Sequence, residues 1–151
     1  MASSSGSERK VQAMTIDCDK YFVDPPMELD EDLGLYRQAE KIIGKELAGL
    51  LVVHGDQQFV DAEVYPHREL LADPLLLHQA LSLSEAMGLY SENSDFANNY
   101  LFPFAIDDFG SSYCVSIRGG GTIVFYDHDT GSIISVANGL RHFFNECVIA
   151  L

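Results

Sequence analysis

The sequence predicts a single α+β domain with a mostly antiparallel sheet of about five or six strands flanked by helices. Its 151 residues suit one domain, and a domain of that size buries about 70% of the surface that its unfolded chain exposes. Hydrophobic residues make up 47% of the sequence, which is enough for one continuous core. The last third alternates short apolar runs with glycine- and aspartate-rich turns. Such short connections favour antiparallel pairing, because parallel neighbours need crossovers of a dozen residues or more.

The N-terminal third predicts a tail followed by helices. Residues 1–14 are polar and predict a flexible tail, so the domain is expected over residues 15–151, beginning with an extended segment at 15–23 that ends at Asp24-Pro25-Pro26. A helix follows, with Leu and Tyr side chains directed inward, because one face repeats at steps of three and four: Leu29, Leu33, Tyr36, Glu40 and Ile43. Gly44 is expected to end this helix, and residues 45–54 predict a second, shorter one before a turn at Gly55-Asp56.

The middle of the chain predicts one strand and one helix. Residues 58–65 alternate, with Phe59, Asp61 and Glu63 on one side and Val60, Ala62 and Val64 on the other, which is typical of a half-buried strand. Residues 74–79 fit a helix or a buried strand equally well, because periodicity cannot assign so short an apolar run. Ser82 and Glu85 form a capping-box pattern that starts a helix over 83–91. Residues 93–99 are polar and predict a loop.

The last third predicts a meander of strands and a final helix. The strands are expected at 101–105, 113–117, 122–126 and 132–136, joined by turns at 107–112, 119–121 and 127–131 whose Gly and Asp residues permit positive φ angles. Asn138 is expected to cap the helix, whose buried stripe is Leu140, Phe143, Phe144 and Cys147.

The charge balance excludes one class of partner and favours another. Nine Lys and Arg against 23 Asp and Glu give a net charge of −14, which repels the phosphate backbone of a nucleic acid. The same charge attracts a basic protein and accelerates their encounter. No Lys or Arg occurs from Glu69 to Ile117, a stretch that carries seven acidic residues. We therefore expect no nucleic-acid partner.

Cysteine usage and hydropathy bear on the compartment. Cys18, Cys114 and Cys147 are odd in number and lack CxxC spacing, so they indicate neither a disulfide framework nor a zinc site, and Cys114 and Cys147 fit a core. The polar start lacks the apolar segment of a signal peptide, and no apolar run approaches 18 residues. These features favour the reducing cytoplasm and predict no membrane association.

Several short motifs, taken in order, resemble the SUKH superfamily of Smi/Knr-like proteins. An acidic helix leads to Glu40 and Gly44, and a turn at His54-Gly55-Asp56 precedes the first strand. The central element is an apolar strand with a proline, then an acidic residue two before a glycine, then an aromatic; the matching residues are Leu101, Pro103, Asp108, Gly110 and Tyr113. Residues 124–129 and 134–144 resemble the next strand and the final strand with its helix. Two features depart from the pattern: Leu47-Ala48 replaces the usual Leu-Pro, and the chain has no tryptophan.

This resemblance implies the SUKH fold and a non-enzymatic function. Many members are immunity proteins, so the resemblance implies a protein that binds and neutralises a cognate toxin domain, often a nuclease or deaminase. Other relatives imply the alternative of a regulatory or scaffold adaptor that binds a signalling protein. An orphan hydrolase is a third hypothesis.

Motifs that could carry chemistry have simpler explanations. Asp127-His128-Asp129 contains metal-ligand types, but adjacent turn residues point apart and no third convergent ligand is evident. Asp107-Asp108 lacks an accompanying nucleophile motif, and a turn carboxylate commonly accepts a backbone N–H. Gly119-Gly120-Gly121 lacks the Lys-Ser/Thr and the helix of a phosphate-binding loop. We therefore expect no catalytic residue, no cofactor and no metal.

The remaining candidate is an acidic surface. Two turns carry paired carboxylates, and a face formed by both would suit a basic toxin, although two strands separate the turns and the sequence leaves open whether they lie at the same end. Two further carboxylates on the first strand are expected to face solvent. The predicted partner-binding residues are Asp61, Glu63, Asp107, Asp108, Asp127 and Asp129.

Overall fold

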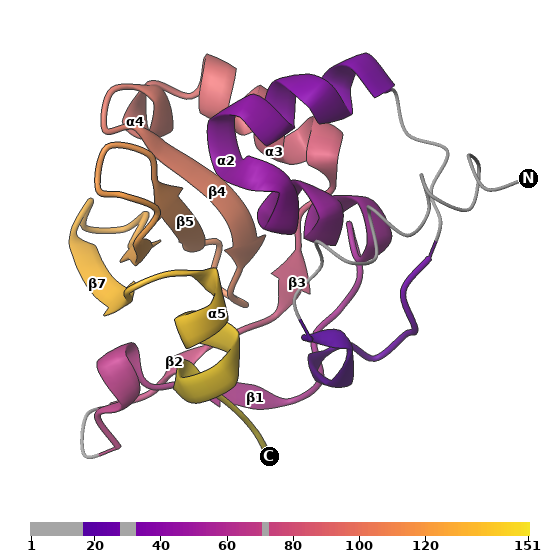
Figure 1. Ribbon diagram of the computed structural model, residues 1–151. Helices are drawn as coiled ribbons and strands as arrows, with labels where there is room; N and C mark the ends of the chain where they lie inside the picture. Colours follow the sequence, from indigo (N-terminus) through magenta and orange to yellow (C-terminus); the bar gives the residue numbers. More distant parts are fainter. Residues whose placement is uncertain (1–16, 28–32, 71–72) are drawn as a thin grey trace, which may run out of the picture.

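The computed structural model describes residues 17–27, 33–70 and 73–151 and has the predicted α+β architecture (Figure 1). Among these residues, five strands form an antiparallel sheet in the order β3-β4-β5-β6-β7. The strand bounds are Gln79–Ala80, Leu101–Ile106, Ser112–Ser116, Ile123–Tyr126 and Ile133–Ala137. The four strands predicted from the last third are therefore confirmed. The ambiguous segment at 74–79 is extended, and its end supplies β3. The predicted tail at 1–14 lies outside the described residues.

A second, three-stranded sheet lies beside the first, in the order β2-β1-β8. Its strands are β2 (Leu75–Leu76), β1 (Ala62–Val64) and β8 (Val148–Ala150). The strand predicted over 58–65 is thus shorter than expected and belongs to a separate sheet. Gln58 and Phe59 make isolated bridges instead, to Gln79 and Phe22. The alternation also shifts, because Phe59, Ala62 and Val64 are all buried.

Helix α2 (Leu33–Val53) contains the break predicted at Gly44. The φ of this residue is 84°, which lies in the left-handed region that glycine adopts without a steric penalty, so two helical segments meet there. The expected start at Leu29 lies outside the described residues. The expected inward stripe is wrong at Leu33, which is exposed, and Ala39 supplies the buried contact in that part of the helix.

Helix α3 (Leu83–Glu92) begins as the capping pattern predicts, since Ser82 Oγ accepts the N–H of Glu85 at 3.1 Å. It packs beside α2, as Figure 1 shows. The loop predicted at 93–99 is wrong in part. Asn93 Oδ1 accepts the N–H of Asp95 at 2.9 Å and caps a one-turn helix, α4 (Ser94–Ala97), whose Phe96 is buried.

The C-terminal segment is a short helix followed by a strand. Helix α5 (Leu140–His142) continues into a π-helical turn, η3 (Phe143–Cys147), and the buried Phe143, Phe144 and Cys147 confirm most of the expected stripe. Asn138 is not the cap; Gly139 holds that position, with no side-chain cap. The β-branched Val148 and Ile149 then leave the helix and pair with β1 as β8.

Aromatic side chains fill the core between the sheets and helices. Among the described residues, the largest fully buried side chains include Phe102, Phe104, Tyr113, Phe143 and Phe144. A smaller apolar cluster around Phe96, Cys114 and Tyr126 covers the other face of the large sheet. Both faces of β4 and β5 are therefore buried, and the positions expected for Cys114 and Cys147 in the core are confirmed. Within the described ranges, no helix has the length and apolar character needed to span a membrane.

Candidate functional site

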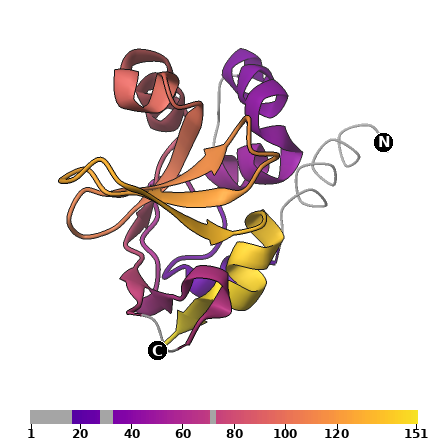
Figure 2. The same ribbon diagram turned by 90° about the vertical axis from the view of Figure 1, so that its left-hand side faces the viewer.

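The two acidic turns of the large sheet lie against each other. We call residues 107–111 and 127–131 the acidic turn pair; they connect β4 to β5 and β6 to β7. Connections in an antiparallel meander alternate between its two ends, so turns separated by two strands share one end (Figure 2). The backbone N–H of His128 donates to Ser111 Oγ at 3.3 Å, and His128 Nε2 lies in hydrogen-bond contact with the Phe109 carbonyl. The structure thus brings the two turns, and with them Asp107, Asp108, Asp127 and Asp129, to one end of the large sheet.

Two of these aspartates hold the turns in shape. Asp107 is only 7% exposed, and its Oδ1 accepts the backbone N–H groups of Phe109 and Ser111, both at 2.9 Å. Asp127 Oδ1 accepts the N–H of Asp129 at 2.9 Å. Carboxylates in such turns replace the backbone hydrogen bonds that the reversal leaves unmade.

The other two aspartates face solvent, and so does an aromatic side chain of the same turns. The side chains of Asp108 and Asp129 are 55% and 77% exposed, and Phe109 is 71% exposed. Asp108 Oδ1 lies 2.9 Å from His78 Nδ1, and Asp129 Oδ1 lies 3.3 Å from His128 Nδ1. A surface with an exposed apolar side chain and accessible carboxylates can contact a partner that is both apolar and basic.

His128 lies at the centre of the acidic turn pair. The hydrogen bond to the Phe109 carbonyl raises the pKa of its imidazole above the ordinary value, partial desolvation opposes this, and the charges of Asp129, Asp127 and Asp107 add to the increase. Both ring nitrogens of His128 contact oxygen atoms of the turns: Nε2 contacts the Phe109 carbonyl, and Nδ1 contacts the Asp129 carboxylate.

The last two predicted residues lie on the other sheet. Asp61 precedes β1 and is exposed, whereas Glu63 lies within β1, where its Oε1 accepts the hydroxyl of Tyr65 at 2.8 Å. Glu63 pairs with Leu76 and Ile149 across the small sheet. These two carboxylates do not belong to the acidic turn pair.

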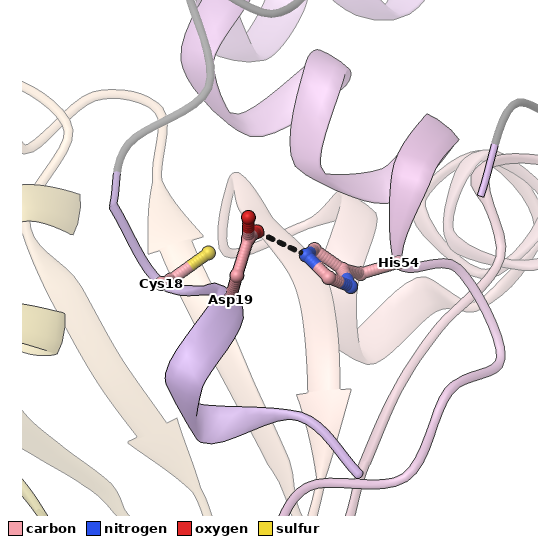
Figure 3. Close-up of side chains that lie close together, drawn as sticks. All are labelled: Cys18, Asp19 and His54. Carbon is pink, nitrogen blue, oxygen red and sulfur yellow. Dashed lines mark hydrogen bonds and ion pairs between the residues drawn. The ribbon is translucent and has the colours of Figure 1, made fainter. Parts of the chain in front are cut away.

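A second cluster, which the sequence analysis missed, lies at the end of α2. Cys18, Asp19 and His54 point toward one another, and one ligand atom from each lies within 4.8 Å of the other two (Figure 3). His54 Nε2 is 2.7 Å from Asp19 Oδ1. Cys18 and Asp19 begin the 3₁₀ helix η1 (Asp19–Tyr21), and His54 follows the last turn of α2. We call these three residues the His54 cluster.

His54 is fully buried and contacted on every polar atom. Its Nδ1 lies 2.7 Å from Gln57 Oε1, and the Gln57 amide nitrogen donates to the Pro25 carbonyl at 3.0 Å. The ring stacks on Phe22 with centroids 3.9 Å apart and an interplanar angle of 4°. The next residue is Gly55, and a larger residue would clash there, because its Cβ atom would lie 2.4 Å from the Leu51 carbonyl oxygen. Packing and hydrogen bonds thus fix the imidazole in one orientation.

The cluster does not have the arrangement of a cysteine nucleophile. Burial raises the pKa of the Cys18 thiol to about 12, and the charges of Asp19 and Asp17 add to this effect. Reactive cysteines instead have lowered pKa values beside a base or a positive charge. Here the imidazole pairs with Asp19. Because 35 residues separate Asp19 from His54, no local sequence signal could have joined them.

The fold defines a class: a small α+β domain with two antiparallel sheets and acidic turns at one end of the larger sheet. The family model for the SMI1 / KNR4 family (SUKH-1) matches residues 28–146, so the chain belongs to this family, as its motifs predicted. The match includes both turns and His54 but begins after Cys18 and Asp19. Neither the curated proteins nor the solved structures gave a significant match.

Proposed function

We propose that this protein is an immunity protein that binds a cognate toxin domain, of nuclease or deaminase type, and blocks its active site or substrate approach. SUKH domains are commonly immunity proteins, and the chain belongs to that family. The observation that carries the proposal is the joining of two acidic turns by the contact of His128 with the Phe109 carbonyl, on a surface where the Phe109 side chain is exposed.

The charge around the acidic turn pair supports a basic partner. From Leu101 to Ala137 the sequence contains one Arg and no Lys. That residue, Arg118, lies in the turn at the opposite end of the sheet, with its guanidinium 3.6 Å from the Tyr100 ring centroid. The strands of the large sheet therefore bring no Lys or Arg to the acidic end. A toxin that cleaves or deaminates nucleic acid has a basic cleft, which an acidic surface can occupy and to which it is steered.

The rigidity of the turns supports tight binding. Asp107 and Asp127 fix their own turns, and the contact of His128 with Phe109 ties one turn to the other. Binding energy concentrates in a few anchors, among which aromatic residues are enriched, and an anchor held in place before binding loses less entropy on association. Phe109 is the anchor of this surface, and Asp108 and Asp129 are its charged rim.

The test measures the affinity of the purified protein for a candidate toxin domain, such as one encoded beside its gene, together with protection of cells that express that toxin. The test variant combines Asp108→Lys, Phe109→Ala and Asp129→Lys. It leaves Asp107 and Asp127 in place because they hold the turns. The matched control reverses two exposed acidic residues elsewhere, Asp24→Lys and Glu92→Lys.

We expect the test variant to lose binding and protection while the control, with the same change in net charge, keeps most of both. Equal loss in both proteins would show a general charge effect and contradict the proposed surface. A separate variant, Asp61→Lys with Glu63→Lys, examines whether β1 adds contacts. If every toxin domain tested fails to bind and a signalling protein binds instead, the adaptor hypothesis replaces the immunity hypothesis.

A further inference from the structure

We propose that Cys18, Asp19 and His54 form a site for one divalent cation of the zinc class. Thiolate, carboxylate and imidazole are the three side-chain ligands that zinc takes in proteins. The structure brings one of each together at a single point, from two segments far apart in the chain.

The spacing is close to that of a bound ion. Tetrahedral zinc with bond lengths of about 2.0 to 2.3 Å places its ligand atoms roughly 3.3 to 3.6 Å apart. The three atoms here lie within 4.8 Å of one another, and the closest pair, Asp19 Oδ1 and His54 Nε2, is 2.7 Å apart. Closing the site needs shifts of about 1 Å. Asp19, whose side chain is 55% exposed, can make such a shift without disturbing the core.

The surroundings of His54 match those of a metal-binding histidine. Such a ligand donates its other ring N–H to an oxygen acceptor, which fixes the tautomer and directs the free nitrogen at the ion. Here Nδ1 faces Gln57 Oε1 at 2.7 Å. The amide of Gln57 cannot reverse without losing its bond to the Pro25 carbonyl, so Oε1 stays directed at the ring. Gln57 is therefore a positioning residue for the proposed site.

An ion also suits the polar atoms that meet in the cluster. Nδ1 of His54 faces the Gln57 amide oxygen and Nε2 faces the Asp19 carboxylate, each at 2.7 Å. A bound cation would lie between Nε2 and the carboxylate and would take the place of the thiol proton of Cys18, which leaves to solvent. The negative charges of Asp17 and Asp19 near the sulfur are then opposed by the ion.

The location indicates an ion that joins two segments of the chain and keeps one open coordination position. Three protein ligands leave the fourth coordination position for water on the exposed side of Asp19. Cys18 and Asp19 precede the family match at 28–146, whereas His54 lies within it. The ion would thus clamp the preceding segment to the end of α2, beside the stacked rings of Phe22 and His54.

The experiment titrates the purified full chain with ZnCl₂ and, as a spectroscopic probe, CoCl₂ under reducing conditions. We expect one ion per chain and, with cobalt, a thiolate charge-transfer band and the d–d spectrum of a tetrahedral site. Cys18→Ser should remove the charge-transfer band, and Asp19→Asn should weaken binding at least about ten-fold. Gln57→Leu, which keeps all three ligands, should weaken it by about 10- to 100-fold.

The controls are Cys147→Ser and Asp24→Asn. Cys147 is the other thiol near an imidazole, with His142 Nε2 4.0 Å away, and Asp24 is an exposed aspartate outside the cluster. Both variants should bind like the parent. A hundred-fold excess of zinc over Kd should raise Tm on the order of 5–10 °C relative to the metal-free protein, and Cys18→Ser should lose this rise.

Two outcomes would overturn the proposal. One is the absence of stoichiometric binding by the folded parent protein at micromolar zinc or cobalt. The other is a cobalt charge-transfer band that survives Cys18→Ser and disappears in Cys147→Ser, which would place the thiolate ligand elsewhere. Neither measurement involves a toxin, so the result is independent of the proposed function.

Discussion

Two histidines in this molecule have the same hydrogen-bond pattern in opposite surroundings. His128 contacts a backbone carbonyl and an aspartate on an exposed turn, and His54 contacts an amide oxygen and an aspartate within the core. The partners of His128 lie in two neighbouring turns, where water screens their charges. The partners of His54 come from distant segments, and burial makes every unmet hydrogen bond costly. His128 therefore belongs to a surface that a partner can contact, whereas His54 belongs to a cluster that stabilises the fold.

The largest expected difference is in stability. His54→Ala in metal-free buffer should lower the free energy of unfolding by about 2–4 kcal/mol, because it removes the ring packed on Phe22 and leaves Gln57 Oε1 without its donor. His128→Ala should cost less than about 1 kcal/mol. Urea unfolding followed by circular dichroism measures both. Equal losses would refute the distinction between the two sites.

The two kinds of turn aspartate should differ by a smaller amount. Asp107→Ala removes the acceptor of two backbone N–H groups and should cost about 1–2 kcal/mol. Asp108→Ala, at the neighbouring exposed position, should change stability by less than about 0.5 kcal/mol. Thermal unfolding of the two variants makes the comparison. A similar Tm for both would contradict the turn-holding role of Asp107.

The exposed ring of Phe109 should affect binding more than stability. Phe109→Ala should change stability by less than about 0.5 kcal/mol, since its side chain has little burial to lose. If the proposed function holds, the same change should weaken binding of the toxin domain by about 2 kcal/mol, or roughly 30-fold. Calorimetric titration measures the affinity. An unchanged Kd would remove Phe109 from the interface.

The smallest expected effect is a pH dependence at His128. Its pKa is raised in the folded protein, so its stabilising contribution is fully present below the ordinary value near 6.5 and is lost as pH rises through the raised pKa. An NMR titration of the imidazole should give a midpoint above that of an unfolded chain. His128→Gln should remove this part of the pH dependence, whereas a midpoint at or below the ordinary value would contradict it.

The elements that could be predicted are those whose sequence signal lies within the element or next to it. The four strands from β4 to β7 follow from short apolar runs between glycine and aspartate turns, and the break in α2 follows from Gly44. The start of α3 follows from Ser82 and Glu85. In each case the signal and the structure lie within a few residues of one another.

Features that depend on contacts between residues far apart in the sequence could not be predicted. Val148–Ala150 becomes a strand because β1 offers an unpaired edge, which helical spacing does not reveal. The joining of the two acidic turns depends on strand order. The His54 cluster depends on a contact across 35 residues, so nothing in the sequence near Asp19 or near His54 pointed to their meeting.

The pairing of β8 with β1 has a consequence for synthesis of the protein. Ala62–Val64 leaves the ribosome long before Val148–Ala150 does, and at about 5–20 residues per second the delay is several seconds. Throughout that interval one edge of β1 has no strand to pair with, and a nascent chain with an open edge is prone to join others. A truncated product that stops before residue 148 keeps this exposed edge permanently, which makes it a substrate for chaperones and proteases.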